Sequence, residues 1–417
     1  MRVAIVGAGI VGVSTAIWLQ RAGHAVVLVD RSGPGEGASH GNAGVLARAS
    51  VVPVPVPGLW RKAPAMLLDP RQPVYLKWHH LPRLLPWLVR YMAQATEAGV
   101  ARRARAILPL IGDSLSDHQA LAAGTGAERF VLPSDYLYVY DGIEDYRADA
   151  GYWAARRAAG FDWEVLDQAE LRAAEPAFGP AVTCAARMRD HGRISDPGAY
   201  VKTLATHVAA RGGQVLRGDV TGVVLDSDGV SDRGRVTGLR ISGETLRCDA
   251  VVLAAGAWSK PLAEELGLRV PMESERGYHL DLWEPSVMPR APAMVASGRF
   301  VATPMEGRLR LAGIVEFGGL DAPPSPAPFR LLEENIRRAM PGLTWARRVE
   351  WMGHRPSMVD SLPMIGAVPG VAGAFAGFGH DHLGLTAGPR TGQLLAQIVS
   401  GRRPDIDLSP YDPARFA

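Results

Sequence analysis

Three glycines near the start of the chain have the spacing of a turn that binds a dinucleotide. Residues 3–6 form an apolar run, and the segment Gly7-Ala8-Gly9-Ile10-Val11-Gly12 follows it directly. Gly7 allows a tight turn, Gly9 lets the backbone approach a pyrophosphate, and Gly12 lets a helix pack close to the strand. A helix that starts at this turn presents free N–H groups and a partial positive charge to phosphates. The pattern therefore predicts a bound dinucleotide.

An acidic residue follows at the position expected in a dinucleotide-binding strand–helix–strand unit. The helical period of residues 10–22 is followed by a second apolar run, residues 25–29, which ends at Asp30. Asp30 has the approximate spacing from the glycines of a carboxylate that bonds ribose hydroxyls. A glycine-rich turn without a ligand would explain the glycines but not Asp30. The motif by itself does not distinguish NAD from FAD.

Composition limits the class of protein. A chain of 417 residues is long enough for two domains and a large core, and a net charge of +3 indicates no nucleic-acid partner. Cys184 and Cys248 are the only cysteines, without metal-ligand spacing or a disulfide framework, so we expect no metal site. No apolar run reaches transmembrane length, and no signal-peptide cleavage site follows the N-terminus. The sequence therefore favours a cytoplasmic protein.

One segment leaves an alternative open. Residues 78–92 (WHHLPRLLPWLVRYM) are apolar, aromatic and basic, a composition that suits a membrane surface. Pro82 and Pro86 interrupt the segment, which favours a core or lid element instead. Peripheral contact with the inner face of the membrane stays open.

The remaining patterns predict elements that alternate along the chain. Residues 33–58 predict an extended loop, and residues 250–253 predict a strand buried on both faces that returns to the first sheet. Residues 136–140 and 270–330 read as strands, as do 214–216, 221–225, 236–241 and 244–248. Helices are expected at 84–124, 144–159, from 167, 197–211, 331–339 and 386–399. This order predicts a nucleotide domain that is assembled from three separated pieces.

Four segments together resemble the FAD-dependent amine and amino-acid oxidoreductases of the D-amino-acid oxidase superfamily. The resemblance is strongest to D-amino-acid dehydrogenases, including hydroxyproline-degrading relatives, and runs over nearly the whole chain. The segments are residues 7–30, 39–44 (SHGNAG), 251–259 (VVLAAGAWS), and the pair 353–357 (GHRPS) and 379–386 (GHDHLGLT).

The resemblance implies an α/β fold: a Rossmann-like FAD-binding domain with an interleaved α+β substrate domain, whose mixed antiparallel sheet covers the flavin. The FAD-binding domain would comprise residues 1–48, 190–268 and 350–417. Residues 49–189 and 269–349 would form the substrate-binding domain.

The resemblance also implies FAD, held non-covalently because the cysteine that anchors flavin in some sarcosine-oxidase relatives has no evident match. Residues 39–44 resemble the loop along the pyrophosphate and the flavin ring, and residues 384–386 resemble a helix N-terminus at the flavin pyrimidine. The implied cofactor-binding residues are Gly7, Gly9, Gly12, Asp30, Arg31, Ser32, Ser39, Asn42, Ala43, Gly44, Val220, Ala255, Gly256, Trp258, Gly384, Leu385 and Thr386.

On the substrate side the resemblance implies three residues. Arg355 would bind the substrate carboxylate, because a guanidinium matches its two-pronged geometry. Tyr278 would donate its hydroxyl to that carboxylate or close the site, and His40 would line the pocket. Asp381 departs from the glycine that is common in relatives. Trp78 and Trp87, as lid residues, would favour an uncharged substrate.

The implied reaction is oxidative deamination of a D-amino acid, or of a D-proline- or hydroxyproline-type amine, by hydride transfer from Cα to flavin N5. The product is an imino acid and then a 2-oxo acid. No lysine falls in a matched active-site segment, which favours a quinone or a partner protein over oxygen as electron acceptor. Two alternatives stay open: a glycine- or sarcosine-type oxidase that produces hydrogen peroxide, and the flavin subunit of a multi-subunit dehydrogenase.

Overall fold

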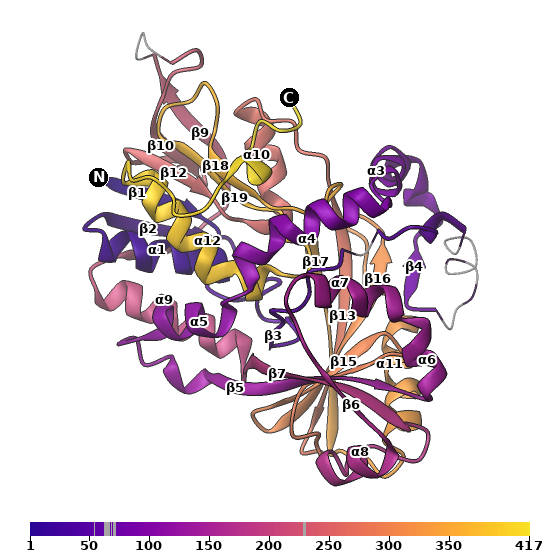
Figure 1. Cartoon of the computed structure of the whole chain (residues 1–417). Helices are drawn as coiled ribbons and strands as arrows, with labels where there is room; N and C mark the ends of the chain where they lie inside the picture. The colour runs from indigo at the N-terminus through magenta and orange to yellow at the C-terminus, as the bar shows by residue number, and fades with distance from the viewer. Residues whose placement is uncertain (54, 62–66, 68, 70–71, 228–230) are drawn as a thin grey trace.

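A computed structural model describes residues 1–53, 55–61, 67, 69, 72–227 and 231–417 of the chain (Figure 1). Within these residues the strands pair into three sheets, of six, three and ten strands. The figure shows helices α1, α9 and α12 beside the sheet that contains the N-terminal strand, while helices α8 and α11 lie at the opposite end of the molecule.

The six-stranded sheet is built around the predicted nucleotide turn. Its order is β18-β19-β12-β1-β2-β8, and the pairs are parallel except β18 with β19. The predicted return of residues 250–253 is confirmed, because β12 is fully buried and pairs with β1. The strands are β1 (Arg2–Val6), β2 (Ala25–Asp30), β8 (Gln214–Arg217), β12 (Ala250–Leu253), β18 (Met364–Ala367) and β19 (Ala374–Phe378).

Five helices complete this half of the core. Their apolar faces share one cluster of buried residues with the six-stranded sheet, to which Ile107 and Leu110 of α4 and Leu121 of α5 belong. α4 and α5, which were predicted to belong to the substrate domain, both pack against α12 of the nucleotide half, and α5 also packs against β5 and β7 of the largest sheet. The helices are α1 (Ile10–Arg21), α4 (Glu97–Ile111), α5 (Ser114–Ala122), α9 (Pro197–Ala210) and α12 (Gly384–Val399).

The largest sheet forms the other half of the molecule and is mostly antiparallel. Its order is β17-β13-β16-β15-β14-β5-β7-β3, with β4 beside β16 and β6 beside β7. The strands are β3 (Val45–Leu46), β4 (Val74–Leu76), β5 (Val131–Tyr140), β6 (Glu164–Leu166), β7 (Cys184–Ile194), β13 (Met272–Trp283), β14 (Ala293–Val295), β15 (Phe300–Met305), β16 (Arg308–Phe317) and β17 (Arg347–Met358).

Sheet membership differs from the predicted domain boundaries at three strands. β3 and β17 lie in the ten-stranded sheet, although residues 1–48 and 350–417 were assigned to the nucleotide domain. β7 crosses the boundary expected at residue 190. Strand pairing with partners far away in the sequence decides these memberships, and local patterns carry no information about it.

The remaining elements include a hairpin sheet and connecting helices. The predicted hairpin is confirmed in a sheet of β9 (Val220–Asp226), β10 (Arg235–Ile241) and β11 (Glu244–Arg247). The further helices are α3 (Leu81–Ala93), α6 (Ile143–Ala148), α7 (Ala150–Ala158), α8 (Gln168–Ala174), α10 (Ser259–Glu265) and α11 (Ala327–Ala339). Short 3₁₀ turns span Trp78–His80, Glu128–Phe130, Gly256–Trp258 and Ser409–Tyr411.

Local signals placed several helix starts correctly. Asp167 caps α8 in a capping box with Glu170, and Asp196 caps α9 by accepting from the Ala199 N–H. The helix expected at 84–124 is divided into α3, α4 and α5, because Thr96 starts a new helix by accepting from the Gly99 N–H. In the part of the chain that the structure describes, no helix combines the length and apolarity needed to span a bilayer.

Candidate active site

A cavity of about 1250 Å³ is lined by residues of both large sheets. One wall consists of the glycine turn, the end of β2 and the start of α12. The other wall consists of β13, β16 and β17. Arg355 lies on β17. Of the predicted cofactor residues, all line the cavity except Gly12 and Gly44.

The glycine turn is closed by contacts that only glycine permits. Gly7 has φ +105°, and a Cβ there would lie 2.5 Å from the Ala254 oxygen at the end of β12. A Cβ on Gly12 would overlap the Gly7 oxygen. Ser39 accepts from the Ile10 N–H at 2.9 Å, which ties the loop of residues 39–44 to the first turn of α1. The turn therefore has the geometry that a pyrophosphate requires.

The Asp30 carboxylate organises the end of β2. One oxygen accepts from the Ala8 N–H at 2.9 Å, and the other accepts from the N–H groups of Ser32 and Gly33 at 2.9 and 3.0 Å. The Arg31 guanidinium lies 3.8 Å from the centre of the Trp258 ring, a cation–π contact between β2 and the turn after β12. These residues form the polar end of the cavity.

The N-terminus of α12 also opens onto the cavity. Residues 383–386 line it, and no side chain in the described part of the chain caps the helix. The buried His118 lies 2.9 Å from the Leu385 oxygen, and the Thr386 hydroxyl donates to the Val45 oxygen at 3.4 Å. Because the positive end of the helix dipole faces the cavity, it favours a group that carries negative charge there.

Arg355 extends into the cavity from β17. It pairs in register with Glu275 of β13, and its guanidinium lies over Gly277, where a Cβ would come within 2.7 Å of the Arg355 Cζ. Among the described residues, no hydrogen bond or ion pair engages this guanidinium, so it can bind an anion in the cavity. Glycine at position 277 leaves the space that it occupies.

The carboxyl groups around Arg355 are biased towards their neutral forms. Burial raises the pKa of Glu275 against the opposing charge of Arg355, and the Ser357 hydroxyl donates to it at 2.9 Å. Burial and the proximity of Glu275 raise the pKa of Asp381 well above its ordinary value. Both shifts weaken the tendency of these carboxyl groups to carry a negative charge beside Arg355, so its guanidinium retains attraction for an added carboxylate.

His382 also opens onto the cavity, and its side chain has no hydrogen-bond partner among the described residues. Its position deep in the fold, with the charge of Arg355, lowers its pKa to about 4. No role for His382 was predicted from the sequence. The one local feature that could have indicated a role for His382 is its position two residues after His380 in a glycine-rich turn.

The structure does not bring Tyr278 to Arg355. Tyr278 is among the residues that line the cavity. Because adjacent residues of a strand point to opposite faces, its side chain points away from Gly277, and the residue is only 1% exposed. Its hydroxyl donates to Glu316 at 2.7 Å and accepts from the Ser325 N–H at 2.9 Å. A hydrogen bond to a substrate carboxylate would require the tyrosine to break both contacts and change faces.

His40 also lies outside the cavity. Its ring packs near His279 and Trp351, with centroids 6.4 and 6.0 Å away, behind the loop that lines the cavity. The two predicted lid residues are elsewhere as well: Trp78 is exposed, and the buried Trp87 donates to the Ser357 oxygen at 3.2 Å. Neither tryptophan lines the cavity, so their expected influence on substrate charge has no basis in this geometry.

One group of lining residues was not predicted from the sequence. The group includes Tyr138, Tyr152, Arg156 and Arg299. The Arg156 guanidinium donates to the Tyr138 hydroxyl at 2.8 Å and lies 4.6 Å from the centre of that ring. The alternating tyrosines of residues 136–140 were recognised as a strand, but nothing local indicates that this strand faces the same cavity as Arg355.

The donor set of the cavity suits a dinucleotide rather than a metal ion. Glycine turns, a free helix N-terminus and backbone N–H groups are typical of phosphate sites. Among the described residues, no three His, Cys, Asp or Glu side chains are grouped so that they could hold a metal ion.

Comparison with known proteins gives a consistent result. Residues 2–398 match the family described as FAD dependent oxidoreductase (DAO). A D-amino-acid oxidase of Bradyrhizobium diazoefficiens is 38% identical, covering 99% of this chain and 98% of that protein. A D-amino acid dehydrogenase of Methylobacterium nodulans is 31% identical, covering 100% of this chain and 99% of that protein.

Solved structures share the fold over nearly the full length. Glycine oxidase from Geobacillus kaustophilus superimposes with a TM-score of 0.72 at 23% identity, covering 100% of this chain and 99% of that one. L-proline dehydrogenase from P. horikoshii superimposes with a TM-score of 0.73 at 16% identity, covering 100% and 97%.

Proposed function

The chain belongs to the family of FAD-dependent oxidoreductases, and from this premise we propose that it oxidises a D-amino acid whose carboxylate binds to Arg355. The Arg355 guanidinium carries the proposal, because it faces the cavity without a partner among the described residues. The names of the relatives, D-amino-acid oxidase and D-amino acid dehydrogenase, support the substrate class.

The cofactor would lie along the first wall of the cavity. Asp30, Arg31 and Trp258 would hold its adenosine end, and the glycine turn would hold the pyrophosphate. The N-terminus of α12 would face the ring system and favour the negative charge that the ring gains on reduction. Bound FAD supplies the acceptor for a hydride from the substrate Cα.

The protein would contribute orientation. A bidentate contact to Arg355 fixes the substrate carboxylate, and the space over Gly277 keeps the guanidinium in place. When the carboxylate is fixed, the Cα–H bond can point in only a few directions. Restricting the orientation of the reacting bond in this way lowers the barrier to hydride transfer. The part of the cavity lined by Tyr138 and Tyr152 would accommodate the substrate side chain.

The test is an anaerobic screen of the purified flavoprotein. D-amino acids, L-amino acids, sarcosine and hydroxyproline isomers are added singly, and the visible absorbance of the flavin is followed. We expect D-amino acids to bleach it and their L-enantiomers to leave it unchanged. Bleaching by glycine or sarcosine alone would favour an oxidase of small amines, and no bleaching would refute the proposal.

We also propose that electrons leave to a quinone at a membrane surface, where α3 makes a peripheral contact. Trp78, Leu85 and Val89 are large apolar side chains that are 58, 51 and 61% exposed on α3 and the turn before it. Arg83 and Arg90 are exposed on the same helix, a composition that suits an anionic lipid surface.

This second proposal has its own assays. Wild-type protein should float with anionic vesicles and reduce a short-chain quinone faster than it consumes oxygen. The double variant Leu85→Glu, Val89→Glu should not bind the vesicles and should remain at the bottom of the gradient. A matched exposed substitution on β6, Val165→Glu, should float like wild type. Equal behaviour of both variants, or rapid formation of hydrogen peroxide, contradicts the proposal.

A further inference from the structure

The loop of residues 39–44 is held from behind by a buried polar network of the substrate sheet. Three consecutive carbonyl oxygens in this loop, those of His40, Gly41 and Asn42, all accept hydrogen bonds from side chains that do not line the cavity. The donors are Arg310 of β16 and His279 of β13.

Arg310 supplies two of these contacts. Its guanidinium donates to the His40 oxygen at 2.7 Å and to the Asn42 oxygen at 2.9 Å. The same guanidinium forms a bidentate pair with Asp281 at 2.7 and 2.8 Å. The arginine side chain has 0% exposure and the aspartate 7%. The pair therefore lies in the core and points its remaining donors at the loop.

His279 holds the carbonyl between them. Its Nδ1 lies 3.1 Å from the Gly41 oxygen, and because a carbonyl only accepts, Nδ1 must carry the proton. Its ring stacks on Trp351 at 4.9 Å and 16°. A Cβ on Gly41 would overlap the Trp351 ring, so glycine is required where the loop passes over this stack.

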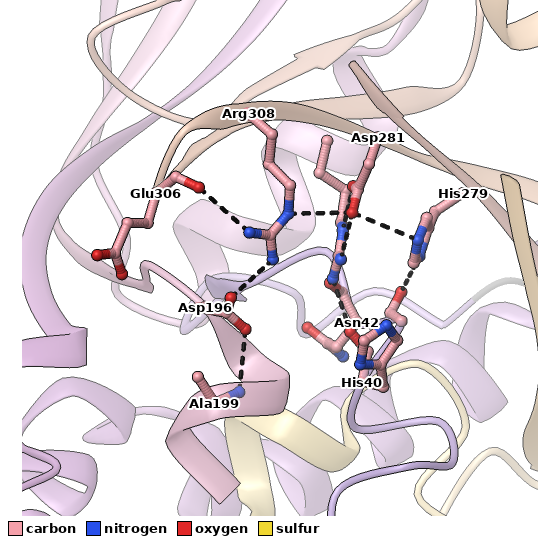
Figure 2. A network of polar contacts seen from close by, with 10 residues as sticks. His40, Asn42, Asp196, Ala199, His279, Asp281, Glu306 and Arg308 are labelled. Carbon is pink, nitrogen blue, oxygen red and sulfur yellow. Dashed lines mark hydrogen bonds and ion pairs between the residues drawn. The ribbon is translucent and has the colours of Figure 1, made fainter. Parts of the chain in front are cut away.

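The network extends to the nucleotide half of the molecule (Figure 2). Asp281 also pairs with Arg308 at 3.0 Å, and Arg308 pairs with Asp196 at 3.0 Å. Asp196 caps α9 through the Ala199 N–H. Hydrogen bonds and charge from Arg310 outweigh the effect of burial and hold the pKa of Asp281 below its ordinary value. Asp281 therefore stays charged between the two arginines.

The direction of three carbonyls sets the direction of three N–H groups. In a planar trans peptide the oxygen of one residue and the N–H of the next point to opposite sides. The N–H groups of Gly41, Asn42 and Ala43 therefore point away from Arg310 and His279, on the side where these residues line the cavity. None of the three has a hydrogen-bond partner among the described residues.

We propose that Arg310, Asp281 and His279 are positioning residues that aim the N–H groups of residues 41–43 at the bound FAD and thereby raise its affinity and its redox potential. Donors held in this way stabilise the electron-rich reduced ring more than the oxidised ring. The inference rests on FAD as cofactor and not on the identity of the amino acid.

The experiment compares two buried arginines in the holoenzyme. Arg310→Lys keeps a positive charge, but lysine cannot make the bidentate contact together with two carbonyl contacts. The matched control is Arg276→Lys. Arg276 is also fully buried on β13, pairs with Glu316 at 2.7 Å, and donates to the oxygens of Ala322 and Pro323, but it does not line the cavity.

Three quantities are measured for each variant: the dissociation constant of FAD on reconstitution, the midpoint potential, and the melting temperature of the apoprotein. For Arg310→Lys we expect at least tenfold weaker binding of oxidised FAD. We expect a further tenfold loss for reduced FAD, which lowers the potential by about 30 mV for a two-electron couple. Arg276→Lys should lower the melting temperature and leave both flavin quantities within twofold of wild type.

His279→Phe provides a milder test that retains the stack on Trp351 and removes the donor to Gly41, together with the 3.8 Å approach of Nε2 to Asp281. It should weaken FAD binding about threefold and, like Arg310→Lys, lower the midpoint potential of the flavin. Wild-type affinity and potential in His279→Phe, or equal flavin effects in Arg310→Lys and Arg276→Lys, would overturn the proposal. If Arg310→Lys does not fold, His279→Phe decides the question.

Discussion

Replacing Arg355 by alanine should lower kcat/KM for an amino-acid substrate by a factor of about 100 to 1000 while FAD stays bound. The magnitude follows from the contact that the guanidinium can make. Two charge-assisted hydrogen bonds to a carboxylate contribute about 1.5–3 kcal/mol each. The lower half of the combined range, roughly 3–4 kcal/mol, corresponds to two to three powers of ten, at about 1.4 kcal/mol for each.

The protein itself should tolerate this change. Arg355 makes no hydrogen bond or ion pair with a described residue, so no partner is stranded. Its charge opposes the effect of burial on Glu275, and without it the pKa of Glu275 rises further. The carboxyl group then becomes neutral rather than an unpaired buried charge. We therefore expect the flavin absorbance per protein and the melting temperature to stay near their wild-type values.

The assay is steady-state turnover with an artificial electron acceptor. The substrates are a D-amino acid and the amine that lacks its carboxylate. Arg355→Ala should depress turnover of the amino acid strongly and of the amine little, because only the amino acid loses a contact. Arg355→Lys retains the positive charge but cannot make the two-pronged contact of a guanidinium, so its kcat/KM for the amino acid should lie between those of wild type and Arg355→Ala. A loss below fivefold for the amino acid, or an equal loss for the amine, would refute the carboxylate role.

Three further results are expected. Gly277→Ala should raise KM at least tenfold without removing any charge, because its Cβ would displace the Arg355 guanidinium; unchanged kinetics would contradict the geometry. Asp381→Asn should become more stable relative to wild type as the pH rises above about 4, because the raised pKa of Asp381 makes ionisation costly in the folded state; urea unfolding at pH 5 and 8 checks this, and a constant difference would argue against it. His118→Gln should reduce the loss of stability between pH 7 and 4.5 by about 2–3 kcal/mol, because burial lowers the pKa of His118 to about 4 and the unfolded chain takes up the proton first. Parallel pH curves for His118→Gln and wild type would show that another group is responsible.

The family and its cofactor were within reach of the sequence. The prediction of an FAD-dependent oxidoreductase is confirmed by the family match over residues 2–398. The strand, turn, helix and strand of residues 2–30 form as expected, and so do the capped starts of α8 and α9. Each of these depends on residues within a few positions of one another, where steric freedom of glycine and side-chain capping act directly.

The substrate side was harder to predict, as Tyr278 illustrates. It is one residue from Gly277, and one residue is enough to move a side chain to the other face of a sheet. Tyr278 consequently packs in the core with Glu316, and Gly277 lies beneath Arg355. The sequence pattern shows that a strand is present, but it does not show which face turns towards the cavity.

The nucleotide turn, the order of most elements and the family could all be predicted from the amino-acid sequence, because they depend on local sterics and on contiguous motifs. Only the tertiary structure decided that β5 shares a cavity with β17, that His40 lies behind its loop, and that Arg310 and His279 hold three carbonyls of that loop. These contacts join residues more than 200 positions apart through strand pairing and burial, and such partners meet only when the whole sheet has formed.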